Sequence, residues 1–306
     1  MGKYIIKRLL GLIPLLIAVS FLIFLFVHLI PGDPARLMAG KDATLNEVQA
    51  IRVELGLDKP LLQQYLMYMN DLLHGDLGHS LRSDVSVTQL FGERFIPSMI
   101  LSLLSIGWAV VCGVLMGVVS AVFRGKWPDY FGTVTAISGI SVPNFWLGLV
   151  MIQLFAVVLG VLPAGGIESW TGYILPSIAL GAGIMAMITR FTRSSLVQTL
   201  QEDFIRTARS RGMNEKTVVF GHALKNSLIT VLTIAGLQFG YLLGGSIVVE
   251  SVFSFPGMGR LLIDSIQFRD YPVVQSLLLI FSLEFILVNF LVDILYGFLN
   301  PKIRYK

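Results

Sequence analysis

The chain has 306 residues, of which 55% are hydrophobic and only 14% are charged, with a net charge of +4 and a mean hydropathy of +0.76. Soluble domains average roughly 45–50% apolar and about 25% charged residues. A soluble fold of this length could not bury so much apolar surface, so the composition excludes an ordinary soluble enzyme and a disordered chain. It leaves a polytopic membrane protein, provided that the apolar residues occur in long runs.

Six long stretches with few or no charged residues meet that condition, because a membrane-spanning helix needs about 20 mostly apolar residues. Backbone polar groups must pair internally in lipid, so each stretch is predicted to be a helix. The first, third and fourth stretches contain Pro14, Pro143 and Pro176, and each proline is expected to bend its helix. The predicted spans are residues 9–30, 99–122, 134–160, 172–191, 228–250 and 275–299.

The predicted fold is an all-α polytopic membrane protein with six transmembrane helices. We divide the chain into an N-terminal tail with the first helix (1–30), a long loop (31–97) and a five-helix core (98–306). Within the long loop, helices are predicted at 46–55 and 61–73, each ended near a glycine. The loop is either a small cap over the bundle or a platform or lid for an external partner, and the sequence does not decide between them.

Six spans place both chain ends on one side of the membrane. That side carries 15 of the 23 Lys and Arg residues, and the opposite side carries 8. Because cytoplasmic loops are enriched in positive charge, both termini and the loop 190–227 are predicted to face the cytoplasm. This sidedness explains the net positive charge, so no nucleic-acid partner is predicted, and membrane lipid is the expected surroundings.

The basic loop 190–227 begins with the pattern of a short amphipathic helix. Residues 200–211 place Phe204 and Ala208 on one face at a spacing of four residues. Gly212 follows and is suited to the left-handed turn that commonly ends a helix.

A second helix is predicted over residues 215–224, with Asn214 as its N-cap, and it runs into the fifth span. Two short helices joined by a glycine and attached to a membrane helix would act as a lever on that helix. The alternative is an interfacial helix that lies on anionic lipid, and the pattern leaves both interpretations open.

The same loop resembles a known sequence motif. Residues 206–212 (Arg-Thr-Ala-Arg-Ser-Arg-Gly) and 222–226 (His-Ala-Leu-Lys-Asn) resemble the cytoplasmic "EAA" loop of ABC importer permeases, in the variant found in peptide importers. The general motif begins Glu-Ala-Ala, so the contact that its acidic residue makes elsewhere cannot be transferred here. Further agreeing stretches are 31–34, 55–60, 75–78 and 256–260.

Over nearly its whole length the chain is similar to the B-type permeases of the dipeptide, oligopeptide, nickel and glutathione importers. Residues 244–250 and 300–306 are most similar to the glutathione-import branch. The resemblance implies a type I ABC importer permease fold. It also implies import of glutathione or of di- and oligopeptides across the inner (cytoplasmic) membrane by alternating access.

The resemblance implies three kinds of partner: a second, similar permease, two cytosolic ATPase subunits and an extracytoplasmic solute-binding protein. The ATPase subunits would bind ATP and magnesium, and this chain would need no cofactor of its own. The residues implied to form the ATPase-docking and coupling loop are Phe204, Arg206, Thr207, Ala208, Arg209, Gly212 and Met213.

Polar and small residues within the spans are candidates for the solute pathway. A charge at the bilayer centre costs about 3 kcal/mol on insertion scales, so Glu284 and Asp293 are expected to face protein or water. Near the outer mouth, Glu250 is expected at a solvated rim or against a solute-binding protein. Glycines spaced by four residues either pack helices closely or leave room for solute. The candidate pathway residues are Ser141, Asn144, Gln238, Gly240 and Gly244.

Motifs that carry chemistry are missing from the sequence. It contains no G-x-x-x-x-G-K-[ST] phosphate-binding loop and no H-E-x-x-H motif, so neither a catalytic nor a metal site is predicted. Energy for transport must then come from another chain. The main alternative is an autonomous transporter driven by protons, with Glu284 and Asp293 as carriers. Such transporters often contain two matching halves, and no internal repeat is evident here.

Overall fold

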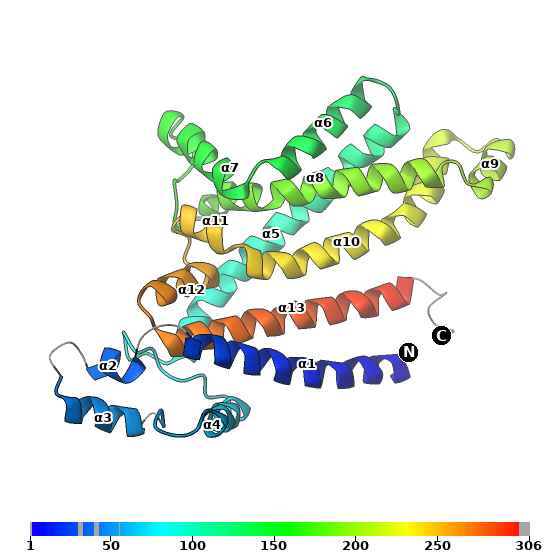
Figure 1. Cartoon of the computed structure of the whole chain (residues 1–306). Helices are drawn as coiled ribbons and strands as arrows, with labels where there is room; N and C mark the ends of the chain where they lie inside the picture. The colour runs from blue at the N-terminus through cyan, green and yellow to red at the C-terminus, as the bar shows by residue number, and fades with distance from the viewer. Residues whose placement is uncertain (1, 30–32, 40–42, 55, 300–306) are drawn as a thin grey trace.

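Long helices run side by side along the molecule in the computed structural model, which describes residues 2–29, 33–39, 43–54 and 56–299 (Figure 1). Their order is α1 (Gly2–Leu29), α2 (Pro34–Ala39), α3 (Leu45–Glu54), α4 (Leu61–Leu73), α5 (Val87–Val122), α6 (Trp127–Ser141), α7 (Asn144–Met151), η1 (Ile152–Val158), η2 (Trp170–Tyr173), α8 (Ile174–Thr199), α9 (Asp203–Ser210), η3 (Thr217–Ala223), α10 (Leu224–Gly245), α11 (Ile247–Val252), α12 (Met258–Gln267) and α13 (Tyr271–Leu299).

Four helical segments among the described residues are long and apolar enough to cross a membrane: Arg8–Leu29, Val87–Val122, Trp170–Thr199 and Tyr271–Ile294. Two bent helix pairs, within 127–158 and 217–242, raise the number to six when each pair is taken as one crossing. The all-α fold predicted from the sequence is thereby confirmed.

The third predicted span, 134–160, is wrong as a single helix. α6 ends at Ser141 and α7 begins at Asn144, and the two parts are inclined by 102°. Pro143 between them lacks an amide hydrogen and has an extended backbone (φ −63°, ψ 135°), so the helical ladder breaks there. The bend expected at Pro143 is confirmed, but it is sharp enough to separate two helices.

Other spans also differ from the prediction at their ends, and α1 and α8 continue through Pro14 and Pro176 without a break. α5 begins well before residue 99, because Ser86 caps it by accepting a hydrogen bond from the Gln89 amide at 3.3 Å, and the helix extends beyond its apolar stretch. The fifth span stops at Gly245, and the residues that follow form the separate short helix α11.

α5 and α8 pack closely against each other in the core. A Cβ added at Gly113 would lie 2.8 Å from the Met185 carbonyl oxygen, and one at Gly117 would lie 2.5 Å from the Thr192 Cβ. Side chains of any size are therefore excluded at both positions. The glycine spacing of this span serves close helix packing, as small residues do between membrane helices.

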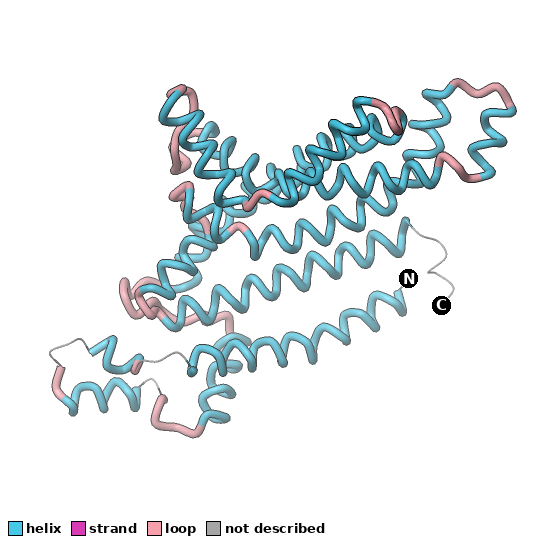
Figure 2. The backbone as a smooth tube through the Cα atoms, turned by 45° about the horizontal axis from the view of Figure 1, so that its top comes forward, coloured by secondary structure: helices cyan, strands magenta, loops and turns pink. Residues whose placement is uncertain are grey.

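The two ends of the bundle carry different elements. Figure 1 shows α9 at the same end as the start of α1 and the end of α13, with α2–α4 and α12 at the opposite end, and Figure 2 shows the same division. We call these the α9 end and the cap end, where the cap is α2–α4 with their connections.

The two longer helices of the cap, α3 and α4, confirm the prediction for 46–55 and 61–73. The cap is fastened to α13 at Asp270, which accepts hydrogen bonds from Ser80 Oγ (2.5 Å) and from the Leu81 amide (3.0 Å). Because Asp270 is buried, these bonds fix the cap against the bundle.

Candidate functional site

α9 is held on the bundle by one apolar face. Ile205 and Ala208 are buried in a cluster with Val118 of α5, Leu196 of α8 and Val218 of η3. The sequence places Phe204 and Ala208 on a shared face, but of these two only Ala208 is buried. Ile205 and Ala208, three residues apart, make the contact, and the Phe204 side chain is 45% exposed.

The turn after α9 follows the predicted geometry. Gly212 has φ +74°, the left-handed conformation, and its amide donates to the Arg209 carbonyl oxygen at 2.9 Å. Asn214 Oδ1 accepts from the Lys216 amide at 3.0 Å and caps the next helix. Gly212 thereby ends one short helix and aims the chain into the following one.

An ion pair closes this turn. Arg209 donates to Glu215 through two nitrogens, at 2.5 and 3.2 Å. The guanidinium holds the pKa of the Glu215 carboxyl below its usual value, chiefly through this hydrogen bond. Both side chains are about half exposed, so the pair orders the turn more than it stabilises the fold.

Several other side chains of α9 and of the turn after it are exposed. We call the exposed side chains Phe204, Arg206, Thr207 and Met213 the docking face. The exposed Phe204 and the 40% exposed Met213 are apolar, and Arg206 supplies a charge. Apolar anchors beside an arginine are typical of protein–protein contacts. Of the other predicted docking residues, Arg209 and Gly212 form the turn and Ala208 is buried behind it, and docking at these residues stays a prediction.

η3 connects this element to the membrane helix α10 without a loop. Segments Thr217–Leu228 and Val231–Leu242 are inclined by 46°, so the bend lies within α10. α9 and α10 are therefore joined by a continuous helical path and by the buried contacts of Val218.

A second contact at the α9 end was not predicted from the sequence. Asp129, buried at the start of α6, accepts from Arg193 Nε of α8 at 2.5 Å, from a second guanidinium nitrogen at 2.9 Å and from the Gly125 amide at 2.9 Å. A bidentate arginine pair is the strong form of this interaction. It ties α6 to α8 where both leave the apolar core. The only sequence signal was an acid at the start of an apolar run.

A small cavity of about 200 Å³ lies between α6, α7, α8 and α10, and two predicted pathway residues, Asn144 and Gln238, line it together with Gly183 and Tyr241. Asn144 is brought there by the break at Pro143, because it is the first residue of α7. Two amide side chains in an otherwise apolar wall give donors and acceptors that a polar solute can use.

The other three pathway candidates lie elsewhere. Ser141 donates to the Ile137 carbonyl oxygen of its own helix at 2.9 Å. Gly240 packs on α13, where an added Cβ would lie 3.4 Å from Phe285, and Gly244 has open space around it. Their part in a pathway stays a prediction.

The two acidic residues of α13 have different surroundings. Asp293 pairs with Arg8 of α1 at 3.1 Å, towards the α9 end. Both carboxyl oxygens of Glu284 are shielded from solvent and have no hydrogen-bond partner among the described residues. The expectation that Glu284 avoids lipid agrees with this shielding.

Glu250 at the cap end differs from the prediction. It is fully buried rather than at a solvated rim. Oε1 accepts from Ser98 and Ser246 hydroxyls (2.7 and 2.8 Å), and Oε2 accepts from the Gly259 and Arg260 amides (2.8 and 3.1 Å). The carboxylate thus joins α5, α11 and the first turn of α12, where a negative charge is favoured.

Membrane-length helices, an exposed helical element at one end and a polar cavity between the helices are features of membrane transport proteins. A family model described as "Binding-protein-dependent transport system inner membrane component" matches residues 113–305, and the model of the N-terminal part of this component matches residues 1–98. The chain therefore belongs to this family, and it is the membrane subunit of an ABC importer.

Relatives and solved structures agree with this assignment. The chain is 55% identical to the "Glutathione transport system permease protein GsiC" of Pectobacterium atrosepticum and 53% identical to that of Escherichia coli strain K12, each over 100% of both chains. A structure of the MetNI methionine ABC transporter in an inward-facing conformation has a TM-score of 0.58 at 20% identity, covering 70% of this chain and 97% of that one. An amino acid ABC transporter has a TM-score of 0.51 at 21% identity, covering 68% and 94%. Both likenesses concern the fold.

Proposed function

We propose that this chain is the pore-forming permease of an ATP-driven importer for glutathione or related short peptides. The observation that carries the proposal is the full-length identity of 55% and 53% to two permeases named for glutathione transport. The chain is proposed to carry out no catalysis and to hold no cofactor, because ATP and magnesium would be bound by its partners.

The proposed assembly contains a second, similar permease, two cytosolic ATPase subunits and an extracytoplasmic solute-binding protein. The docking face is the proposed seat of one ATPase subunit, since it is exposed, partly apolar and continuous with α10. The chain is proposed to lie in the inner membrane with both termini in the cytoplasm. The larger share of basic residues on that side supports this orientation.

Transport is proposed to follow alternating access. Movement of the ATPase subunits displaces α9, and the displacement passes through η3 to α10, which carries Gln238. The cavity lined by Asn144 and Gln238 then opens to one side or the other. Transport is directional only if the solute binds the two states differently.

The proposed docking is tested with a pair of phenylalanine variants. Phe204→Asp puts a charge into the apolar part of the docking face, and we expect the ATPase subunits to be lost during purification in mild detergent. Phe220→Asp is the matched control, because Phe220 is 57% exposed on the same loop but lies outside the docking face. Equal ATPase recovery from both variants would contradict the proposed docking.

The substrate is tested by uptake of labelled glutathione into cells that express the complete importer. Glutathione is expected to be taken up, and an excess of unlabelled glutathione to compete. Uptake of a dipeptide that glutathione does not inhibit would assign the importer to another substrate. In the same assay Glu284→Gln tests the alternative of a proton-driven transporter. Loss of uptake while ATP hydrolysis continued would favour that alternative over an ATP-driven importer.

A further inference from the structure

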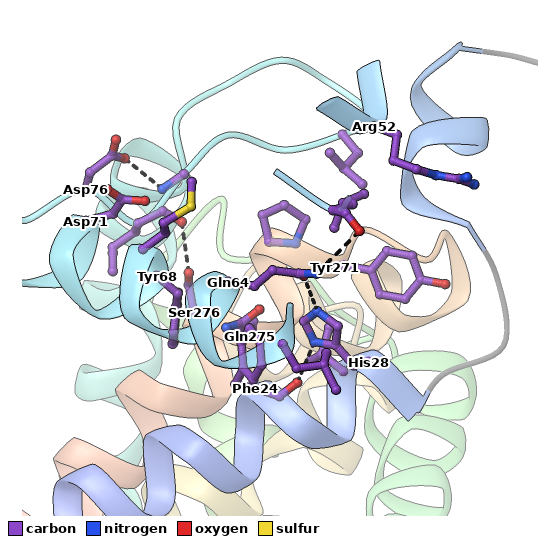
Figure 3. Close-up of a pocket in the computed structure, with 18 of the residues that line it drawn as sticks. Phe24, His28, Arg52, Gln64, Tyr68, Asp71, Asp76, Tyr271, Gln275 and Ser276 are labelled. Atoms are coloured by element: carbon purple, nitrogen blue, oxygen red, sulfur yellow. Dashed lines mark hydrogen bonds between the residues drawn. The ribbon is translucent and has the colours of Figure 1, made fainter. Parts of the chain in front are cut away.

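A second cavity lies at the cap end, apart from the proposed pathway. It has a volume of about 690 Å³ and is enclosed by the end of α1, the cap and the start of α13. Figure 3 shows side chains from all three regions pointing into it. Binding cavities for small molecules typically have volumes of about 300–1,000 Å³, so the space suits a compact organic solute.

The inner wall of the cavity is apolar and aromatic. Phe24 and Val27 of α1, Tyr271 of α13 and the chain segment at Leu77 contribute to it. Phe24 and Tyr271 are buried, and Phe24 is stacked on Tyr68 with ring centroids 6.1 Å apart. This wall suits an apolar side chain of the ligand.

Three polar atoms of the lining, Tyr68 Oη, Tyr271 Oη and Gln275 Nε2, are shielded from solvent and make no hydrogen bond of normal geometry within the described chain. Burial raises the pKa of the Tyr68 phenol to about 12, so it keeps its proton and can donate. The Tyr68 and Gln275 side chains lie next to each other, and their contact partly offsets the effect of burial on the pKa of the phenol. Buried groups that can donate call for an acceptor, and a carbonyl oxygen can accept from the neighbouring Tyr68 and Gln275 side chains.

The rim of the cavity is acidic. Asp71 lies one helical turn after Tyr68 on α4, and Asp76 follows in the next turn of chain. The one guanidinium of the lining, Arg52, is already paired with Asp33 at 2.5 Å. The formal charge that remains at the rim is therefore negative, and it suits an ammonium group.

We propose that this cavity binds the N-terminal aminoacyl unit of a short peptide, with the ammonium group at Asp71 and Asp76 and the first carbonyl oxygen at Tyr68 and Gln275. An ammonium group, a carbonyl oxygen close to it and an apolar side chain are the three features that the lining calls for, and a peptide N-terminus carries all three. The ammonium and carbonyl assignments rest on the cavity alone, and only the choice of peptides as the ligand class rests on the proposed function.

The test uses this chain with its second permease and the two ATPase subunits in nanodiscs of phosphatidylglycerol. The solute-binding protein is left out, so that neither a peptide carrier nor an amine-bearing lipid competes. The probe is the labelled dipeptide phenylalanyl-leucine, and its N-acetyl derivative is the control ligand. Saturable binding is expected for the free peptide, and acetylation is expected to weaken it about tenfold or more, since it removes the charge.

Two conservative variants locate the site. Tyr68→Phe keeps the ring and removes one donor, so binding is expected to weaken about fivefold. Asp71→Asn is expected to weaken it about threefold, because the carboxylate is exposed. The matched controls are Tyr65→Phe, whose hydroxyl bonds Ser20 outside the cavity, and Asp58→Asn, and both are expected to bind as the wild type does.

Absence of saturable binding, equal binding of the acetylated peptide, or equal binding by Tyr68→Phe and Tyr65→Phe would overturn the proposal. Binding that requires ethanolamine lipid in the nanodisc would also overturn it, since a lipid headgroup would then be the occupant. These binding outcomes do not depend on glutathione uptake. Glutathione uptake can therefore fail while peptide binding at this site is observed, and peptide binding can fail while glutathione uptake is observed.

Discussion

Replacement of Glu250 tests how the cap end of the core is held together. This carboxylate accepts four hydrogen bonds in a fully buried setting, two from the hydroxyls of Ser98 and Ser246 and two from the amides of Gly259 and Arg260. The hydroxyls can rotate and act as acceptors, whereas the amides can only donate. The effect of a substitution on stability therefore depends on whether the new side chain still offers an acceptor to the two amides.

Glu250→Gln can keep its oxygen towards the amides of Gly259 and Arg260 and turn its NH₂ group towards the serines. It loses the advantage of a charged acceptor, and we expect a loss of about 2 kcal/mol in the free energy of unfolding. Glu250→Ala leaves both amides unsatisfied at about 1–3 kcal/mol each and also opens a cavity, so we expect a loss of roughly 5 kcal/mol.

The assay is thermal unfolding of the purified complex in nanodiscs, followed by tryptophan fluorescence. Stability is expected to fall in the order wild type, Glu250→Gln, Glu250→Ala. The control is Asp264→Asn, because Asp264 is about half exposed and 3.9 Å from Arg260, so its loss is expected to leave the unfolding temperature unchanged. If Glu250→Ala unfolded at the wild-type temperature, the four hydrogen bonds would not hold this region together.

Three further predictions concern the core and the α9 end. Gly212→Val places a β-branched side chain at φ +74° and is expected to lower transport per ATP hydrolysed while the protein still inserts, whereas Gly212→Asn is tolerated. Gly117→Ala brings a Cβ to 2.5 Å from Thr192 Cβ and is expected to cost roughly 1–3 kcal/mol of stability, measured by thermal unfolding. Arg209 lowers the pKa of Glu215 in the folded protein. The small stabilisation from this pair is therefore fully present above the ordinary glutamate pKa of about 4.3, and it is lost as the pH falls through the lowered pKa of the folded protein. Limited proteolysis of the loop is thus expected to be unchanged from pH 8 to 6 and to speed up only at strongly acidic pH.

The membrane-spanning helices were predictable because lipid requires each apolar stretch to pair its own backbone groups. The turn at Gly212 was predictable for a similar local reason, since few other residues adopt a positive φ at the end of a helix. Pro143 identified a bend, but its 102° angle depends on packing that the local sequence does not encode.

The contacts that could not be predicted join residues far apart in the chain. Ser98 and Glu250 are 152 positions apart, and Asp129 and Arg193 are 64 apart. Nothing in the residues around Glu250 distinguishes an acid at a solvated rim from one that receives four hydrogen bonds. Similarly, Phe204 and Ile205 are both apolar residues of α9, and only the packing against Val118 and Leu196 decides which is buried.

The central claim is that this chain is a passive permease, moved by ATPase subunits that act through the docking face. The most direct measurement is uptake of labelled glutathione into proteoliposomes that contain either this chain alone or the chain with its second permease, ATPase subunits and binding protein. We predict no accumulation by the chain alone and ATP-dependent accumulation by the complete set, abolished by Phe204→Asp. Accumulation by the chain alone under a proton gradient, without ATP, would contradict the account.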